Sequence, residues 1–152
     1  LIALSDLGRT FWTAAGADLP LPVAPESLNQ LTVLLHPASL GERKEMMYLG
    51  THPAYFAIRS GDWVYLPGQG SFGHTTDPSS PWLDLAKQGG RNSDYDAQGR
   101  LRPNAPKEQL YDLRADPQQT TNIIREHPDV AVAMAKRLRQ FMSELQEESQ
   151  AR

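Results

Sequence analysis

The sequence predicts an α+β fold, in which short β-prone runs form a small sheet and a helix follows at the C-terminal end. Three observations predict it. Side chains in residues 56–59 alternate between two faces, with Phe56 and Ile58 on one of them, as in a strand. Gly61 lies between this run and residues 63–66, where glycine permits the positive φ of a hairpin turn. From Pro128 onward, apolar residues recur every three or four positions, as in an amphipathic helix.

Two short helices are expected in the N-terminal part. Over residues 5–15, Leu7 and Phe11 lie four positions apart on one side, and Gly16 stands where a helix-ending glycine belongs. The prolines that follow cannot continue this helix, because proline lacks the amide hydrogen. Leucines then repeat at helical spacing over residues 28–35, and a His-Pro pair ends that segment.

Four β-prone runs predict the sheet: residues 46–49, 55–59, 63–66 and 109–113. The second and third form an antiparallel hairpin. Their alternation suits strands with one face packed and the other nearer solvent. Trp12 and Trp63 are expected to be core residues.

The C-terminal helix is expected to pack one apolar stripe onto the sheet. Pro128 fits the first helical position, and Asp129 complements the positive end of the helix dipole. We expect the helix to fray after Glu147. The stripe consists of Val130, Met134, Leu138, Phe141 and Leu145.

Length, charge and composition restrict the function. The 152 residues suit one domain, and 15 Lys plus Arg against 18 Asp plus Glu give a net charge of −3. This balance gives no electrostatic reason to expect nucleic acid or an anionic membrane as a partner. No apolar run approaches the roughly 18 residues that span a bilayer. The absence of cysteine excludes disulfides, thiolate metal sites and a cysteine nucleophile within this sequence.

A long segment, residues 69–105, is rich in Gly, Ser, Asn, Asp and Pro. Loops of this length are usually functional or disordered. His74 lies in its glycine-rich beginning and His52 precedes a strand, so these two histidines are the candidate ligand-facing residues. The glycine-rich run lacks the lysine of a phosphate-binding loop.

Other candidate sites favour structural roles. Asn92, Asp94 and Asp96 alternate like the first ligands of a calcium loop, but the glycine and glutamate that such a loop needs are missing, so we expect a solvated loop. The histidines lack the spacing of a zinc site. Asp116 precedes a proline and two threonines, a pattern typical of a turn in which aspartate binds backbone amides. No metal ligand or catalytic residue is predicted.

Four segments, taken in order, resemble the C-terminal end of the type I (arylsulfatase-like) sulfatases of the alkaline phosphatase superfamily. The resemblance implies a small antiparallel sheet of about four strands with a packed C-terminal helix, docked on a large α/β catalytic domain. Residues 1–152 are then a C-terminal subdomain, whose first ~20 residues end the catalytic domain. Val64 and Gln119 replace charged residues usual in the family. The segments are residues 4–10 with 15–20, 26–29 with 34–35, 56–63, and 110–117 with 120–123.

The resemblance implies that the parent protein is a sulfuric ester hydrolase. Its calcium ion and formylglycine nucleophile lie upstream of the region that this chain resembles. Residues 79–83 contain Ser79 and Pro81 but lack the arginine of the nucleophile motif, so the chain alone is expected to be inactive. The implied partners are the N-terminal catalytic domain in cis and a sulfated small molecule or saccharide. The long loop is expected to line the substrate pocket, with His74 first and His52 second touching substrate, in a periplasmic or secreted enzyme.

Two other functions stay open from the sequence. One is a non-catalytic module that binds a saccharide or a protein, and the other is the tail of a related phosphoesterase. The upstream sequence distinguishes them, because a Cys-x-Pro-x-Arg motif indicates a sulfatase and a threonine nucleophile favours phosphoesters.

Overall fold

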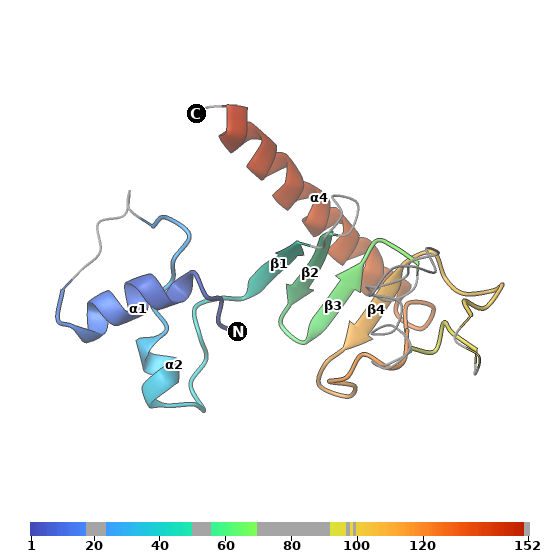
Figure 1. The fold of residues 1–152 in the computed structure, drawn as a ribbon, viewed down its shortest axis with the longest axis horizontal. Helices are drawn as coiled ribbons and strands as arrows, with labels where there is room; N and C mark the ends of the chain where they lie inside the picture. Colours follow the sequence, from blue (N-terminus) through green and yellow to red (C-terminus); the bar gives the residue numbers. More distant parts are fainter. Residues whose placement is uncertain (18–23, 50–55, 70–91, 97, 99, 151–152) are drawn as a thin grey trace. The chain divides into compact units, whose positions relative to one another are not determined.

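The computed structural model describes residues 1–17, 24–49, 56–69, 92–96, 98 and 100–150. Its elements are those of an α+β fold with a four-stranded sheet and a C-terminal helix, which confirms the predicted fold class (Figure 1). The chain divides into two compact units, residues 1–46 and residues 47–152.

The first unit contains two short helices. Helix α1 spans Asp6–Ala14 and helix α2 spans Leu31–Leu35. Gly16 follows α1 with a φ of +77°, and its amide binds the Thr13 carbonyl oxygen at 2.9 Å. The predicted helices and the helix-ending glycine are therefore confirmed. Ser5 occupies the N-cap position but makes no capping hydrogen bond with its side chain.

The sheet has the strand order β1-β2-β3-β4. Its strands are Glu45–Leu49, Phe56–Ser60, Trp63–Leu66 and Gln109–Asp112, close to the four predicted runs. Strand β3 pairs antiparallel with both β2 and β4. Ser60 is paired with Trp63, so Gly61 and Asp62 form a two-residue turn, and Gly61 has a φ of +58°. The predicted hairpin is confirmed, because such turns need positive φ.

Helix α4, Pro128–Gln150, packs on one face of the sheet and forms the main core with it (Figure 1). The strand residues of this core include Ile58 and Leu110, both fully buried. Trp63 packs at its edge and meets the His127 ring edge-on, with 5.2 Å between ring centroids. The buried members of the core are Ile58, Tyr65, Leu110, Ala131, Met134 and Leu138.

Most of the predicted helix stripe is confirmed, but its last residue is wrong. Met134 and Leu138 are buried, and Val130 and Phe141 pack partly against the core. Leu145 is 41% exposed. The helix spans Pro128–Gln150, and fraying after Glu147 stays a prediction.

The opposite face of the sheet is also buried, which corrects the expectation that it lies nearer solvent. Ala57, Val64, Leu66 and Tyr111 form a second buried cluster there. The buried hydroxyl group of Tyr111 joins a network of amide side chains described below.

The first unit differs from the second in what it buries. Among its described residues, the buried ones are all polar: Asp6, Thr10, Ser27 and Gln30. Every buried apolar residue of the described chain lies in the second unit. Trp12 is 46% exposed, so the prediction that it is a core residue is wrong for this chain.

Candidate functional site

The predicted substrate-binding histidines, His74 and His52, lie outside the described residues, and so does most of the loop that carries His74. Two other histidines are described. His36 ends α2, and His127 precedes α4, where its carbonyl oxygen accepts the first amide of the helix from Ala131 at 3.1 Å. Within the described ranges, polar side chains gather in two buried networks, one in each unit.

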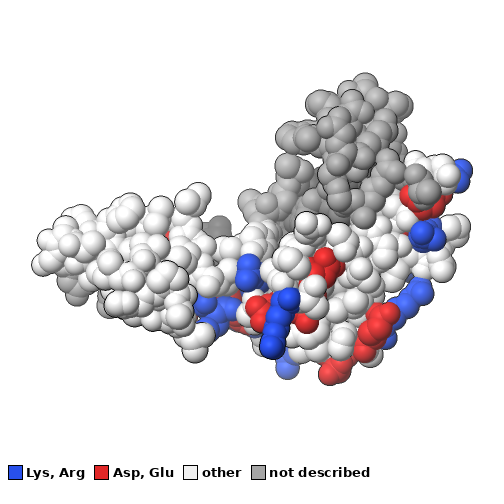
Figure 2. Space-filling model, turned by 90° about the horizontal axis from the view of Figure 1, so that it is seen from below, with Lys and Arg blue, Asp and Glu red and all other residues white. Residues whose placement is uncertain are grey.

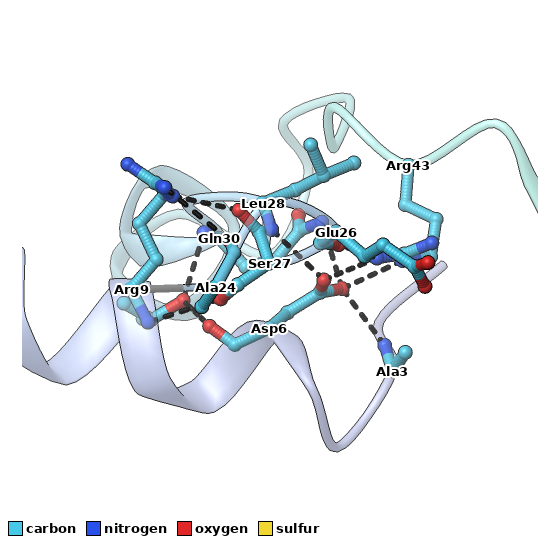
Figure 3. Close-up of polar contacts among 10 residues, drawn as sticks. Ala3, Asp6, Arg9, Ala24, Glu26, Ser27, Leu28, Gln30 and Arg43 are labelled. Carbon is cyan, nitrogen blue, oxygen red and sulfur yellow. Dashed lines mark hydrogen bonds and ion pairs between the residues drawn. The ribbon is translucent and has the colours of Figure 1, made fainter. Parts of the chain in front are cut away.

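The first network is centred on Asp6, at the start of α1 (Figure 3). Its carboxylate accepts two hydrogen bonds from Arg43, Nε to Oδ2 at 2.8 Å and Nη2 to Oδ1 at 2.5 Å. The backbone amides of Ala3 and Leu28 donate to it at 2.9 and 3.0 Å, and the Gln30 amide group donates at 3.3 Å. One carboxylate thus joins the helix to three other segments of the unit.

These contacts set the charge of the pair. Burial by itself raises the pKa of Asp6, but the hydrogen bonds from Arg43, Ala3 and Leu28 and the positive charge of Arg43 outweigh burial and hold this pKa well below its ordinary value. The hydrogen bond with Asp6 raises the pKa of Arg43. Both groups therefore stay ionised at neutral pH, and Arg43 also donates to the Glu26 carbonyl oxygen at 2.8 Å.

The same side of α1 makes three further contacts with the segment that follows residue 24. The Arg9 amide donates to the Ser27 hydroxyl group at 3.1 Å, and the Arg9 Nε donates to the Ser27 carbonyl oxygen at 2.7 Å. The Thr10 hydroxyl group accepts a hydrogen bond from the Gln30 backbone amide at 3.0 Å. The Gln30 Oε1 atom is buried without a hydrogen-bond partner, and a Cβ built on Gly41 would lie only 2.8 Å from it. A side chain at position 41 would therefore require the Gln30 side chain to shift.

The second network joins Asn122 to strand β4. The Asn122 Oδ1 accepts the backbone amides of Leu110 and Ile124 at 3.1 and 3.2 Å. Its Nδ2 donates to the Asp94 carboxylate at 2.9 Å and to the Glu108 carbonyl oxygen at 3.1 Å. Each hydrogen-bonding atom of this side chain has two partners, as a buried amide requires.

Gln109 links the residue before the long loop to Asn92 within the loop. Its Nε2 donates to the Gly68 carbonyl oxygen at 2.7 Å, and its Oε1 accepts from Asn92 at 2.8 Å and from the Tyr111 hydroxyl group at 2.6 Å. Asn92 also donates to that hydroxyl group. Burial raises the pKa of Tyr111, so the phenol stays protonated at neutral pH. Gly68 and Asn92, which flank residues 69–91, are thus tied to one side chain of β4.

These contacts correct the expectation of a solvated loop at residues 92–96. Asn92 and Asp94 are buried, and only Asp96 takes the expected surface role, where it pairs with Arg100 at 2.9 Å. The sequence pattern did not indicate this burial, because Asn122, which donates a hydrogen bond to the Asp94 carboxylate, is 28 positions away. The interpretation of Asp116 is confirmed, since it accepts from the Thr121 amide at 2.8 Å and from the Thr120 hydroxyl group at 3.1 Å.

Neither network has the composition of a catalytic site. Their amide groups and their carboxylates serve as hydrogen-bonding partners of backbone and of one another, and neither contains a nucleophile activated by a base. Within the described ranges, no three His, Asp or Glu side chains gather to hold a metal ion, and the chain has no cysteine. The described residues therefore do not fit the calcium ion and formylglycine of the sulfatase reaction.

The described residues on the face drawn in Figure 2 carry charges of both signs. Acidic and basic side chains lie beside one another on the face drawn in Figure 2, without a broad basic patch among the residues described there. No helix among the described residues has the length and hydropathy needed to cross a membrane.

Comparisons with known proteins found matches among solved structures. The chain is similar to a Bacteroides thetaiotaomicron structure described under the metabolism of multiple glycosaminoglycans and labelled BT33336S-sulf, with 22% identity and a TM-score of 0.49 over 97% of this chain. It is also similar to a structure of BT4656 in complex with its substrate D-Glucosamine-2-N, 6-O-disulfate, with 20% identity and a TM-score of 0.44 over 96% of this chain. The chain spans about a quarter of each structure's length, 24% in both cases. No family model and no curated protein sequence matches it.

Proposed function

We propose that the chain is the C-terminal part of a sulfatase that hydrolyses sulfate esters. The observation that carries this proposal is the series of residues 110–113, 116–117 and 120–122, which resembles the closing series of the sulfatase tail. In the structure, these residues form β4, the Asp116 turn and the Asn122 contacts. Within the series, the side chains of Asp116 and Asn122 accept hydrogen bonds from backbone amides, so the resemblance concerns a motif with a structural purpose.

In the proposed enzyme, the chain forms part of the substrate-binding pocket and supplies no catalytic residue. Gln109 ties Gly68 to Asn92, and Gln69 donates to the Ala105 carbonyl oxygen at 2.9 Å, so the two ends of the long loop are held together. In our proposal this loop lines the substrate entrance, where His74 and also His52 donate hydrogen bonds to substrate oxygens.

The remaining parts of the proposal come from the family resemblance. The partner in cis is an upstream α/β catalytic domain, which holds calcium and the formylglycine nucleophile. The substrate is a sulfated small molecule or saccharide, and the enzyme acts in the periplasm or outside the cell.

The test is to recover the coding sequence upstream of Leu1 and to assay the full-length protein. We expect a Cys-x-Pro-x-Arg or Ser-x-Pro-x-Arg motif and calcium-dependent hydrolysis of a chromogenic aryl sulfate or a sulfated saccharide. The matched control replaces the first residue of that motif with alanine. A threonine nucleophile with activity on phosphate esters would contradict the proposal, as would a full-length protein without hydrolytic activity that binds a saccharide or a protein.

A further inference from the structure

We propose that Arg102 and Arg125 form a binding site for an anionic group of a saccharide, a sulfate or a carboxylate other than the sulfate ester that is hydrolysed. The two side chains are held by the turn at residues 102–105 and its neighbour Tyr95, in the second unit. The inference rests on the proposed function, because the saccharide is the proposed substrate. It goes beyond that function by naming residues that favour a substrate with more than one anionic group.

The first step concerns the turn, which three hydrogen bonds hold in place. The Ala105 amide donates to the Arg102 carbonyl oxygen at 3.0 Å, and the Arg102 amide donates to the Asp94 carbonyl oxygen at 2.8 Å. Gln69 donates to the Ala105 carbonyl oxygen at 2.9 Å. Pro103 occupies the second position of the turn, where the fixed φ of proline is favourable. The turn is therefore held at both ends, and it contacts the first residue of the loop that we propose lines the substrate entrance.

The second step concerns the guanidinium groups of two arginines that come from different segments. The Arg102 Nε donates to the Tyr95 carbonyl oxygen at 3.0 Å, and Tyr95 pairs with Leu101 across a β-bridge beside the turn. The Arg125 Nη2 donates to the Asn104 carbonyl oxygen at 2.5 Å. The first and last Cα atoms of such a turn lie less than about 7 Å apart, so one small region anchors both side chains. A guanidinium group has five N–H donors, so each side chain keeps donors for a ligand.

The third step concerns the charge of the two arginines, which no carboxylate among the described residues neutralises. Residues 97–107 contain three basic residues and no acidic residue. Arg100 pairs with Asp96, whereas the side chains of Arg102 and Arg125 bind only carbonyl oxygens within the described ranges. A carbonyl oxygen orients a guanidinium group without cancelling its charge. The turn therefore presents two positive charges in fixed positions.

The fourth step concerns the chemistry of the ligand. Guanidinium groups bind sulfate and carboxylate oxygens through pairs of hydrogen bonds, and such charge-assisted bonds are roughly twice as strong as bonds between neutral groups. Side chains that are already anchored lose less freedom on binding, which favours affinity. Nucleic acid needs a broad basic surface, which the net charge of −3 and the mixed charges in Figure 2 do not favour. Two anchored arginines suit a discrete anionic group on a saccharide.

The test measures the binding of a heparin tetrasaccharide to the full-length protein with its upstream sequence. The variant combines Arg102→Gln with Arg125→Gln, which removes both positive charges. The matched control combines Arg114→Gln with Lys136→Gln, because these two exposed residues lie after the end of β4 and on α4. We expect the dissociation constant to rise at least about tenfold in the variant and by less than about twofold in the control.

Two further probes identify the bound group. The same tetrasaccharide without its sulfate groups keeps its carboxylates. A variant effect that persists with this probe assigns the site to a carboxylate, and an effect limited to the sulfated form assigns it to a sulfate. A single-stranded DNA of the same charge measures attraction by charge alone. If the DNA bound as tightly as the tetrasaccharide and lost as much affinity in the variant, the assignment to a saccharide would be wrong.

Equal affinity of the wild-type protein and the variant for the tetrasaccharide would overturn the inference. If the variant does not fold, the unmodified protein gives the answer, because bound tetrasaccharide should protect Arg102 and Arg125, but not Arg114, from phenylglyoxal. Full reactivity of the first two arginines would overturn the inference as well. Binding that depends on them in a protein without sulfatase activity would retain the site and reject the proposed function. Hydrolysis of sulfate esters by a protein whose variant binds normally would do the reverse.

Discussion

At the scale of single residues, Asp6 holds the first unit together through hydrogen bonds from four different residues. Replacing it by asparagine removes the charge that Arg43 needs and introduces donors where the site requires acceptors. Removing one partner of a buried ion pair typically costs about 3–5 kcal/mol. We expect Asp6→Asn to reduce the protection of α1 amides against hydrogen exchange by this amount in the full-length protein. Glu42→Gln, at an exposed neighbour of Arg43, should change it by less than about 0.5 kcal/mol.

The low pKa of Asp6 also predicts a pH dependence. The folded protein holds this pKa below the value of about 3.9 for a free aspartate, so the unfolded chain binds the proton first as the pH falls. The contribution of Asp6 to stability is fully present above about pH 5 and is lost progressively as the pH falls below about 4. The measurement is the hydrogen-exchange protection of α1 amides as the pH is lowered, after correction for the intrinsic exchange rates. The Asp6→Asn variant should not show this loss of protection. If the two proteins lost α1 protection identically as the pH falls, a group other than Asp6 would be responsible for the pH dependence.

Asn122 has a comparable position in the second unit. Asn122→Ala would leave the Leu110 and Ile124 amides without their acceptor and Asp94 without its donor. Unsatisfied buried groups cost about 1–3 kcal/mol each, so we expect a loss of at least about 2 kcal/mol in urea unfolding. The control is Thr121→Ala, because only the backbone amide of that exposed residue binds Asp116. Equal effects of the two substitutions would contradict the role of Asn122.

The prediction for enzyme activity concerns His74, which we propose binds the substrate. An imidazole that donates a hydrogen bond to a sulfate or hydroxyl oxygen of the transition state is worth about 1–3 kcal/mol, or roughly five- to a hundredfold in kcat/KM. We expect His74→Ala to lower kcat/KM of the full-length enzyme on its best sulfated substrate by such a factor, and His52→Ala to act in the same direction. The control is His36→Ala, at the end of α2. Unchanged kinetics for both variants, with the fold intact, would contradict a substrate-binding role.

The polar networks show what the sequence could not predict at this scale. The Asp6 carboxylate accepts the Ala3 amide, a contact that is local in the sequence. Its partner Arg43 is 37 positions away, and nothing in the spacing of the two residues indicates the ion pair. The turn at Asp116 was predictable because all its partners lie within five residues.

At the scale of secondary-structure elements, α4 and the sheet depend on each other. Leu138 is buried between them, whereas Lys136 is exposed. Truncation of a buried leucine typically costs about 2–5 kcal/mol, so we expect Leu138→Ala to destabilise the chain by this amount in urea. Lys136→Ala and Leu145→Ala should cost far less, because both side chains are exposed. A large effect of Leu145→Ala would restore the full stripe that the sequence predicts.

The elements themselves were largely predictable, because their signals are local. A period of two residues, a period of three or four residues, and glycines at 16 and 61 determined the strands, the helices and the turns. The burial of the second sheet face and the exposure of Leu145 depend instead on which segments meet in space. Periodicity indicates that a face is apolar, but it does not indicate what covers that face.

At the scale of the whole molecule, the two units differ in their source of stability. The second unit has an apolar core between α4 and the sheet, whereas the described part of the first unit buries only polar side chains. We therefore expect the isolated 152-residue chain to keep its second unit folded and to lose most of the structure of its first unit.

Hydrogen exchange of the isolated chain tests this difference. Amides of β3 and β4 should exchange slowly, close to the rate set by global unfolding, because they lie in the core. Amides of α1 and α2 should exchange at rates near those of an unfolded chain, since isolated helices shorter than about 12 residues are marginal in water. In the full-length protein, α1 should become protected while β3 changes little. Strong protection of α1 in the isolated chain would show that the Asp6 network alone can hold the first unit, and it would contradict the expected difference between the two units.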